Sequence, residues 1–206
     1  MAIRVLAFAT SPRRHGNSET LLDWLLSSMQ EGEDVEVVKH VLNDDIVIHP
    51  CRGCNACEVL GRCVQTDDDL NRVLDEVIEA DIVVLASPIF CLGLCAQAKA
   101  LVDRSQVFRS RKYVLKQPVV PPGRKDKRLG IFVSTAGQKW DIVFDGAKMS
   151  MKCFFHVSDI RDANMWWLLA DGVDKKGEIR GHPTAGDEAE RMGKKAVQWI
   201  RERKGA

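Results

Sequence analysis

Short apolar runs alternate with amphipathic segments along most of the chain. Residues 2–9 (AIRVLAFA), 34–42 and 81–86 are rich in Val, Ile and Leu, a pattern that predicts strands buried on both faces, as in a parallel sheet. Residues 128–134 predict a fourth strand, and the segment 157–169 contains a fifth. The segments with helical periodicity that lie between and after these strands are 19–32, 67–80, 94–107, 141–155 and 187–203.

This alternation predicts a doubly wound, open parallel α/β sheet in one domain that covers residues 1–206. Five strands in a chain of this length favour the flavodoxin-like order 2-1-3-4-5. The competing Rossmann arrangement needs G-x-G-x-x-G after its first strand, and here that loop reads SPRRHGNS. Two segments interrupt the pattern: a cysteine-rich loop at 49–65, after the second strand, and a basic loop insertion at 109–128.

The composition excludes several classes of protein. The chain has 206 residues, of which 45% are hydrophobic and 29% are charged, so it is neither disordered nor a disulfide mini-protein. Its net charge of +1 gives no general attraction to nucleic acid or to anionic membranes. No run approaches the ~18 apolar residues of a membrane helix, and the first apolar run lacks the basic segment of a signal peptide. We therefore expect a cytoplasmic protein.

The loop after the first strand has the features of an anion site. It leads into the N-terminus of a helix, where free backbone N–H groups and the helix dipole favour negative charge. Ser11, Asn17 and Ser18 add side-chain donors. Arg13 adds a planar cation that suits phosphate, and Gly16 permits a sharp turn. From these residues alone, a capped helix beside a solvated basic loop is the alternative.

Two further loops follow strands three and four, whose ends the strand order places beside the end of strand one. The first offers apolar side chains that suit the faces of a flat ring, and the second offers small residues whose N–H groups suit its polar edge. The residues are Ser87, Pro88, Ile89, Phe90 and Gly93 after strand three, and Ser134, Thr135, Ala136 and Gly137 after strand four.

The segments SPRRHGNSETL, SPIFCLGLCAQAKALVDR and STAGQ resemble the three signature loops of the NADPH-dependent FMN reductase superfamily. The resemblance spans residues 2–140. The family pattern S-P-x-[YF], followed by a lysine and D-R, is matched here by Ser87, Pro88, Phe90, Lys99, Asp103 and Arg104. The resemblance implies a flavodoxin-like protein that binds FMN with the residues of the three loops.

The cysteines carry a second signal. There are seven, an odd number, and no export signal accompanies them, which argues against a disulfide framework. Cys51, Cys54, Cys57 and Cys63 spell C-x2-C-x2-C-x5-C, a spacing in which three thiolates wrap one face of a compact metal centre and the fourth closes it. This favours a [4Fe–4S] cluster. Structural zinc is the main alternative, although its cysteines usually form two well-separated pairs, and a redox dithiol is a third interpretation.

This motif inside a flavodoxin-like chain resembles the iron–sulfur flavoproteins of archaea and anaerobic bacteria, which carry FMN and a [4Fe–4S] cluster bound by cysteines in the same position. The resemblance implies a homodimer or homotetramer in which the cluster and the flavin exchange electrons. The last spacing of the motif varies within that family, and five residues lie within its range.

These features predict an FMN-dependent oxidoreductase that passes electrons from a ferredoxin-like donor, through the cluster and FMN, to a small oxidant or quinone. No Ser/His/Asp or paired-carboxylate arrangement indicates a catalytic side chain. The basic residues of 109–128 are interpreted as a solvated loop, with docking of an acidic electron donor as the functional alternative. Two other functions stay open: an NAD(P)H-dependent FMN or quinone reductase with structural zinc, and a non-enzymatic flavin-binding redox sensor.

Several single residues are given structural interpretations. Cys91 and Cys95 lie four residues apart and are expected on one helix face near the second loop. Cys153 precedes two phenylalanines and is expected in the core. His49 is interpreted as a surface imidazole, and Thr66 as the cap of the helix that follows it.

Overall fold

A computed structural model describes residues 2–31, 34–42 and 44–205. At its centre is a parallel sheet with the strand order β2-β1-β3-β5-β6. The strands on this path are β1 (Ile3–Ala9), β2 (Val35–Val41), β3 (Ile82–Phe90), β5 (Leu129–Thr135) and β6 (Met165–Ala170). The two-residue β4 (Gly93–Leu94) pairs antiparallel with the end of β3. With β4 set aside, the predicted order 2-1-3-4-5 and the doubly wound flavodoxin-like fold are confirmed.

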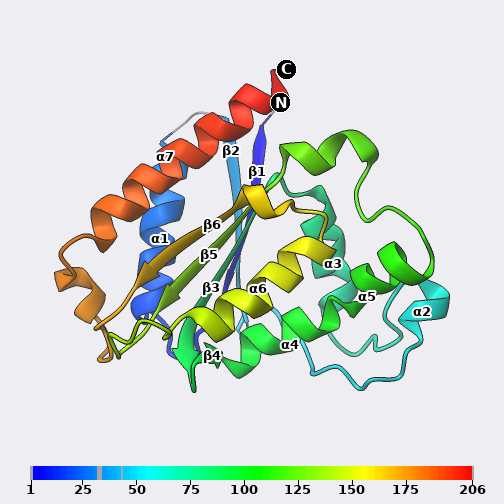
Figure 1. The fold of residues 1–206 in the computed structure, drawn as a ribbon, viewed down its shortest axis with the longest axis horizontal. Helices are drawn as coiled ribbons and strands as arrows, with labels where there is room; N and C mark the ends of the chain where they lie inside the picture. The colour runs from blue at the N-terminus through cyan, green and yellow to red at the C-terminus, as the bar shows by residue number, and fades with distance from the viewer. Residues whose placement is uncertain (1, 32–33, 43, 206) are drawn as a thin grey trace.

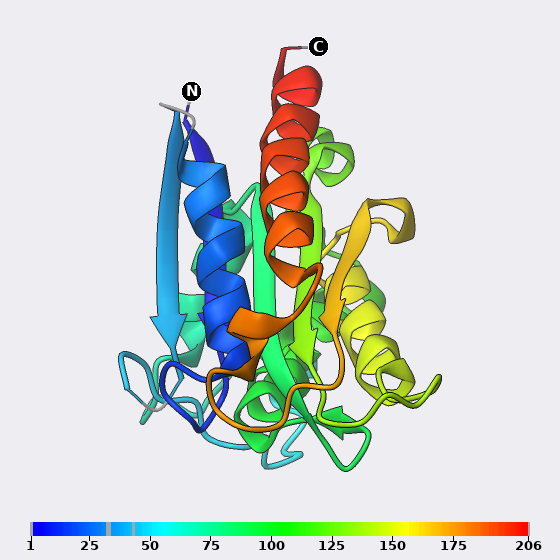
Figure 2. The same cartoon turned by 90° about the vertical axis from the view of Figure 1, so that its left-hand side faces the viewer.

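Helices cover both faces of the sheet (Figures 1 and 2). One face carries α1 and α7, and the other carries α3, α4, α5 and α6. The α-helices are α1 (Asn17–Gln30), α2 (Cys57–Leu60), α3 (Leu70–Glu79), α4 (Ala96–Arg104), α5 (Gln106–Arg109), α6 (Asp145–Val157) and α7 (Ala185–Lys204). Short 3-10 helices cover Pro122–Lys127, Asp162–Asn164 and Glu178–Gly181. Among the described helices, none combines the length and the apolar character that crossing a membrane requires.

Strand β1 shows how the alternation of side chains divides the core. Ile3, Val5 and Ala7 pack in the layer of α1 and α7, whereas Leu6 and Phe8 pack against α3 to α6. All five are at most 3% exposed. Because the central strands are buried on both faces, their sequences are continuous apolar runs.

The start of α3 differs from the sequence prediction. Its N-cap is Asp69, so Thr66 does not cap it. The reason lies in two carboxylates that accept hydrogen bonds from the start of the cysteine-rich loop and the residues just before it: Asp68 from the His49 N–H and Asp69 from the Val47 N–H, both at 2.9 Å. These contacts fix the residues before α3 in a bend. The first helix was predicted to end near Gly32, which lies outside the described residues. Within them, α1 ends at Gln30.

The segment 109–128, expected as a loop insertion, is largely helical. The predicted helix 94–107 is divided into α4 and α5, and α5 passes directly into a π-helix at Ser110–Val114. A 3-10 helix at Pro122–Lys127 then leads into β5. The basic residues of the π-helix region therefore lie on an ordered surface beside α2, to which Arg111 is joined by a hydrogen bond from its Nε to the Gly61 carbonyl at 2.7 Å.

Two basic residues of this segment stabilise the end of α3, so interpreting them as solvated was wrong. Arg128 is completely buried, and Arg124 is half-buried. Together their guanidinium groups donate to the carbonyls of Val77, Ile78, Glu79 and Ala80, which the end of a helix leaves without partners. Burial lowers the pKa of Arg128 to about 10, which still leaves it charged at neutral pH.

The carboxyl ends of the parallel strands meet at one edge of the sheet, and both chain termini lie at the other end (Figure 2). The loops after β1, β3, β5 and β6 gather at the carboxyl edge, and the cysteine segment also begins there (Figure 1). The fold therefore brings together the loops that the sequence analysis selected.

Candidate functional site

A pocket of about 110 Å³ lies at the carboxyl edge, between the ends of β1, β3 and β5. We call it the edge pocket. The predicted residues that line it come from all three loops: Ser11, Arg13, Gly16, Asn17, Ser18, Pro88, Ile89, Phe90, Thr135 and Gly137. The other predicted residues do not line it. Ser87, Ser134 and Ala136 are buried, and the Ser134 hydroxyl donates to the Ser87 carbonyl at 2.7 Å, while Gly93 begins β4.

A fourth loop, which the sequence analysis missed, completes the edge pocket. Val173, Asp174 and Lys176 follow β6 and line the pocket with the predicted residues. The position of this loop in the chain could have identified it. The loop follows β6, the strand next to β5, so it also leaves the sheet at the carboxyl edge.

The amide of Asn17 fastens this fourth loop to the first. Its Nδ2 donates to the carbonyls of Val173 and Lys175 at 3.3 and 3.0 Å, and its Oδ1 accepts from the Gly177 N–H at 2.9 Å. Asn17 is only 8% exposed. Asn17 was predicted to offer a side-chain donor to a ligand, and the structure places this amide in a link between two loops.

The first loop presents a helix N-terminus to the edge pocket. The N-cap of α1 is Gly16, and no side-chain hydrogen bond caps the first turn. A Cβ at Gly16 would lie 2.9 Å from the Arg13 carbonyl oxygen, so this close turn requires glycine. The Arg13 side chain is exposed, and it donates to the Asp174 carbonyl at 3.2 Å. Backbone donors, the helix dipole and a cation therefore point to one place, as an anion site requires.

A buried acid, Glu19, holds the loop after β1 in place. Glu19 is 1% exposed, and its carboxylate accepts from the His15 N–H at 2.5 Å and from Lys39 Nζ at 3.0 Å. His15 has a left-handed φ of 54°. Burial would raise the pKa of Glu19, but the hydrogen bonds and the charges of Lys39 and Arg14 outweigh burial and hold it below the usual value. The acid is therefore ionised and neutralised by its neighbours.

The four clustered cysteines lie around a separate cavity of about 70 Å³, which we call the cysteine cavity. Cys51 and Cys54 are exposed, whereas Cys57 and Cys63 are half-buried. Left-handed turns curl the segment, with φ of 64° at Gly53, 56° at Asn55 and 63° at Gly61. Within the described ranges, no three Cys, His, Asp or Glu side chains are placed to share a single metal ion.

Two of the four thiols accept hydrogen bonds from neighbouring helices. Ser110 Oγ, in the π-helix, donates to Cys57 Sγ at 3.3 Å. Arg104 Nη2, at the end of α4, donates to Cys63 Sγ, also at 3.3 Å. Asn71 of α3 holds the backbone of Cys63 from both sides, accepting from its N–H at 3.3 Å and donating to its carbonyl at 3.1 Å. One side of the cysteine cavity is therefore well ordered.

A buried ion pair lies beneath this ordered side. Arg104 donates to Asp68 from Nη1 at 2.6 Å and from Nη2 at 3.2 Å, and the two side chains are 1% and 0% exposed. Arg104 Nη1 also donates to the His49 carbonyl at 2.7 Å. Burial would raise the pKa of Asp68, but the bonds from Arg104 and the backbone hold it below its usual value. Among the described residues, Arg104 Nε and Gln65 Oε1 are buried without a hydrogen-bond partner, and both residues line the cavity.

The other three cysteines differ from their predicted places. Cys91 is exposed in a turn with φ of 49°, while Cys95 is buried at the N-cap of α4, so the two do not share a helix face. Cys153 is exposed on α6, and the prediction of a core position was wrong. Phe154 and Phe155 are buried, but a helix turns by about 100° per residue, which directs Cys153 to the outside. His49 is exposed, as expected.

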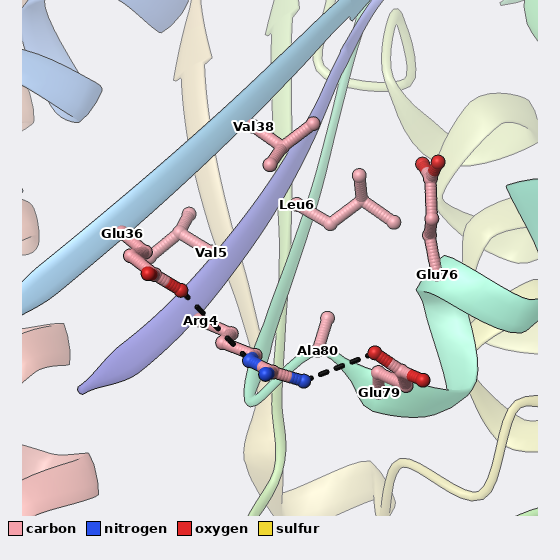
Figure 3. Close-up of a pocket in the computed structure, with 8 residues that line it drawn as sticks. All are labelled: Arg4, Val5, Leu6, Glu36, Val38, Glu76, Glu79 and Ala80. Carbon is pink, nitrogen blue, oxygen red and sulfur yellow. Dashed lines mark hydrogen bonds and ion pairs between the residues drawn. The ribbon is translucent and has the colours of Figure 1, made fainter. Parts of the chain in front are cut away.

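A larger hollow of about 230 Å³ lies away from these cavities, between β1, β2 and α3 (Figure 3). Its one cation, Arg4, pairs with Glu36 at 3.9 Å and with Glu79 at 3.0 Å. The hollow is beside the amino ends of the strands, whereas open α/β sheets bind ligands beyond the carboxyl ends. We therefore assign the candidate site to the edge pocket and the cysteine cavity.

The sequence profile described as NADPH-dependent FMN reductase matches residues 3–140, which include the three predicted loops. The chain belongs to this family. Membership in the NADPH-dependent FMN reductase family confirms the resemblance drawn from the loop sequences.

Curated relatives share part of the chain. An iron–sulfur flavoprotein of Methanocaldococcus jannaschii is 35% identical over 52% of this chain and 54% of its own length. An iron–sulfur flavoprotein of Archaeoglobus fulgidus is 37% identical over 53% of this chain and 48% of its own length. The chain thus spans about half the length of the curated relatives it matches.

Solved structures of the same fold cover nearly the whole chain. An FMN-dependent NADH-azoreductase of Bacillus anthracis superposes with a TM-score of 0.67 at 17% identity, covering 96% of this chain and 100% of its own. An NAD(P)H:quinone oxidoreductase of Methanothermobacter marburgensis superposes with a TM-score of 0.63 at 14% identity, covering 94% and 96%. At these identities the likeness concerns the fold alone.

Proposed function

We propose that this chain is an FMN-dependent oxidoreductase in which electrons pass between a [4Fe–4S] cluster in the cysteine cavity and FMN in the edge pocket. The observation that carries the proposal is the cysteine cavity itself, which four thiols and one buried guanidinium line together in a flavin-reductase fold. A flavin reductase that uses hydride alone does not need such a cavity.

The edge pocket has the groups that FMN requires. The uncapped first turn of α1 and the guanidinium of Arg13 suit the phosphate. Ile89 and Phe90 offer apolar side chains to the ring, and the backbone at Gly137 suits its polar edge. When bound, FMN supplies an acceptor that takes two electrons and releases them singly.

The donor set of the cysteine cavity fits an iron–sulfur cluster. Cys51, Cys54, Cys57 and Cys63 would each bind a different iron, so their sulfur atoms need not converge on one point. A cluster held by four thiolates is anionic, and the Arg104 guanidinium with its unpartnered Nε suits that charge. The curated relatives named iron–sulfur flavoproteins support the same choice.

A ferredoxin-like protein is the donor that we propose, with a small oxidant or quinone as the acceptor, and a homodimer or homotetramer as the working form. A cluster accepts one electron at a time, which matches a ferredoxin, while the flavin delivers electron pairs to a small molecule. Arg109 is exposed and pairs at 3.4 Å with Glu58, which lines the cysteine cavity, so an acidic donor would compete with Glu58 for this cation.

Anaerobic purification followed by metal, sulfide and flavin analysis tests the cofactor content. We expect one FMN per chain, and iron and sulfide in equal amounts of about four each. Colourless protein that contains one zinc and no sulfide would overturn the cluster and favour the structural zinc alternative, in which the chain is an NAD(P)H-dependent reductase.

Anaerobic stopped-flow reduction tests the direction of electron flow. Reduced ferredoxin should reduce the holoprotein faster than NADPH does, and its rate should fall as salt rises, because salt screens attraction between exposed charges. Fast reduction by NADPH that does not depend on salt, with no faster route from ferredoxin, would contradict the proposed donor.

A further inference from the structure

The buried pair of Arg104 and Asp68 connects three parts of the molecule. Arg104 is the last residue of α4, Asp68 precedes α3, and the guanidinium also donates to the His49 carbonyl in the cysteine segment. Burying two charges costs free energy that their attraction offsets only when the geometry is good and the remaining donors are satisfied. The N–H groups of Arg104 that do not bind Asp68 therefore indicate the role of this ion pair.

One of those N–H groups reaches a cysteine of the cavity, and one has no partner in the part of the chain that the structure describes. Nη1 is used by Asp68 and His49, and Nη2 is shared between Asp68 and the Cys63 thiol. The remaining donor, Nε, is buried without a partner among the described residues, and Arg104 lines the cavity. A planar cation with one bond to a ligand thiol and one unused N–H is suited to an anionic group.

We propose that Arg104, held in orientation by Asp68, is a positioning residue that raises the reduction potential of the cluster through Cys63. The inference rests on the proposed cluster and names a determinant of its potential. Reduction adds one negative charge to the cluster. A fixed cation and N–H···S hydrogen bonds stabilise that charge, so they favour the reduced form.

Asp68 opposes this effect while it fixes the geometry. Its carboxylate is ionised and orients the guanidinium from two sides, but its negative charge lies on the same side of the cavity. Asp68→Asn should therefore raise the potential, because the cation keeps its place and loses its counter-charge. Arg104→Gln combined with Asp68→Asn should lower it, because both charges and the bond to Cys63 are removed together.

The test is an anaerobic redox titration of the holoprotein, followed by electron paramagnetic resonance of the reduced cluster. Iron, sulfide and FMN are measured first in every variant. The double variant should shift the ratio of reduced to oxidised cluster about tenfold toward oxidised, which is ~59 mV for one electron. Asp68→Asn should shift it in the opposite direction, and Arg104→Lys should fall between the parent and the double variant.

Two controls separate this role from a general effect of charge. Arg62→Gln removes an exposed cation next to Cys63 in the chain, and solvent screens that charge, so the potential should not change. The flavin midpoint, read in the same titration, should be equal in all variants.

The outcomes distinguish the two proposals. If the parent contains no iron, the proposed function itself fails. If the parent and the double variant both hold a full cluster with equal potentials, the role of Arg104 is wrong. If the double variant does not retain iron, Asp68→Asn decides, and a potential equal to or below that of the parent would overturn the proposal.

Discussion

The edge pocket and the cysteine cavity are built in opposite ways. In the edge pocket the proposed anion site is backbone at the uncapped start of α1, and the Asn17 amide is already bonded to another loop. In the cysteine cavity the binding groups are side chains, two thiols are exposed, and a buried guanidinium keeps one N–H without a partner. The first site offers mainly free backbone N–H groups, whereas the second offers side chains, including a buried guanidinium N–H without a protein partner in the described ranges.

This difference determines how sensitive each site is to the substitution of a single side chain. Removing one side chain from a backbone site removes one interaction, while the N–H groups and the helix dipole remain. Removing one thiol from a cluster site removes a ligand that nothing else replaces. Substitutions in the two cavities should therefore differ greatly in the size of their effect.

The largest effect is expected at the ligand cysteines. Cys54→Ser should lose most of the iron, because a hydroxyl replaces the thiolate that the cluster needs. FMN content should stay near the parent value, because the edge pocket is separate. Iron and flavin analysis after anaerobic purification measures both. Cys153→Ser is the matched control, exposed on α6, and should keep its iron. Equal iron in Cys54→Ser and the parent would contradict the assignment.

A smaller effect is expected when the cation of the edge pocket is removed. Arg13→Ala should weaken the binding of FMN by about 1.5–3 kcal/mol, the range for hydrogen bonds to charged groups. Riboflavin lacks the phosphate and should bind the parent poorly and the variant equally poorly. Fluorescence titration of flavin-free protein measures both affinities. Arg14→Ala is the neighbouring control, since Arg14 pairs with Glu19 and Asp44. If riboflavin and FMN bind the parent alike, the loop is not a phosphate site.

Asn17 offers a way to separate loop linkage from ligand binding. Asn17→Ala should lower the free energy of unfolding by about 1–3 kcal/mol, because backbone groups of the loop after β6 lose their partner. Unlike Arg13→Ala, it should weaken FMN and riboflavin to the same degree. Asn17→Asp keeps an acceptor for the Gly177 N–H but sets a carboxylate oxygen against the Val173 and Lys175 carbonyls, so it should lose at least as much stability. Urea unfolding measures these differences, and a variant as stable as the parent would show that the link is unimportant.

The smallest effect is expected from Glu19, through pH. Because its pKa is lowered on folding, ionised Glu19 stabilises the folded state above the unfolded pKa, near 4.5, and that contribution is lost as pH falls below it. Glu19→Gln lacks this carboxylate. Its urea midpoint should lie below that of the parent at pH 7, and the difference should shrink between pH 5 and pH 3. A difference that is constant over this range would contradict the role of the carboxylate.

Much of the fold and about three quarters of the residues that line the edge pocket could be predicted from sequence, because local sequence patterns indicate them. Runs such as AIRVLAFA identify buried strands, and the strand order then places the ends of three strands together. Contacts between residues far apart in the chain leave no such local pattern in the sequence. Arg104 and Asp68 are 36 residues apart, and Asn17 and Lys175 are 158 apart, so neither pair shows in the sequence.

Basic residues were misjudged for a related reason. Arg124 and Arg128 lie in a polar, proline-containing segment that is typical of a solvated loop. Their role is set by the end of α3, a helix that lies far from them in the chain, whose last carbonyls need donors. Cys153 shows the reverse error, since two buried neighbours in sequence say little about a residue turned to the other side of a helix.

The length of α4 has an evolutionary consequence. Its N-cap Cys95 donates from its backbone N–H to the hydroxyl of Ser87, behind the edge pocket, and its last residue, Arg104, lies beneath the cysteine cavity. One inserted residue within α4 would rotate everything after it by about 100° and move Arg104 away from Cys63. Insertions and deletions should therefore be rare between these two positions in a descendant lineage.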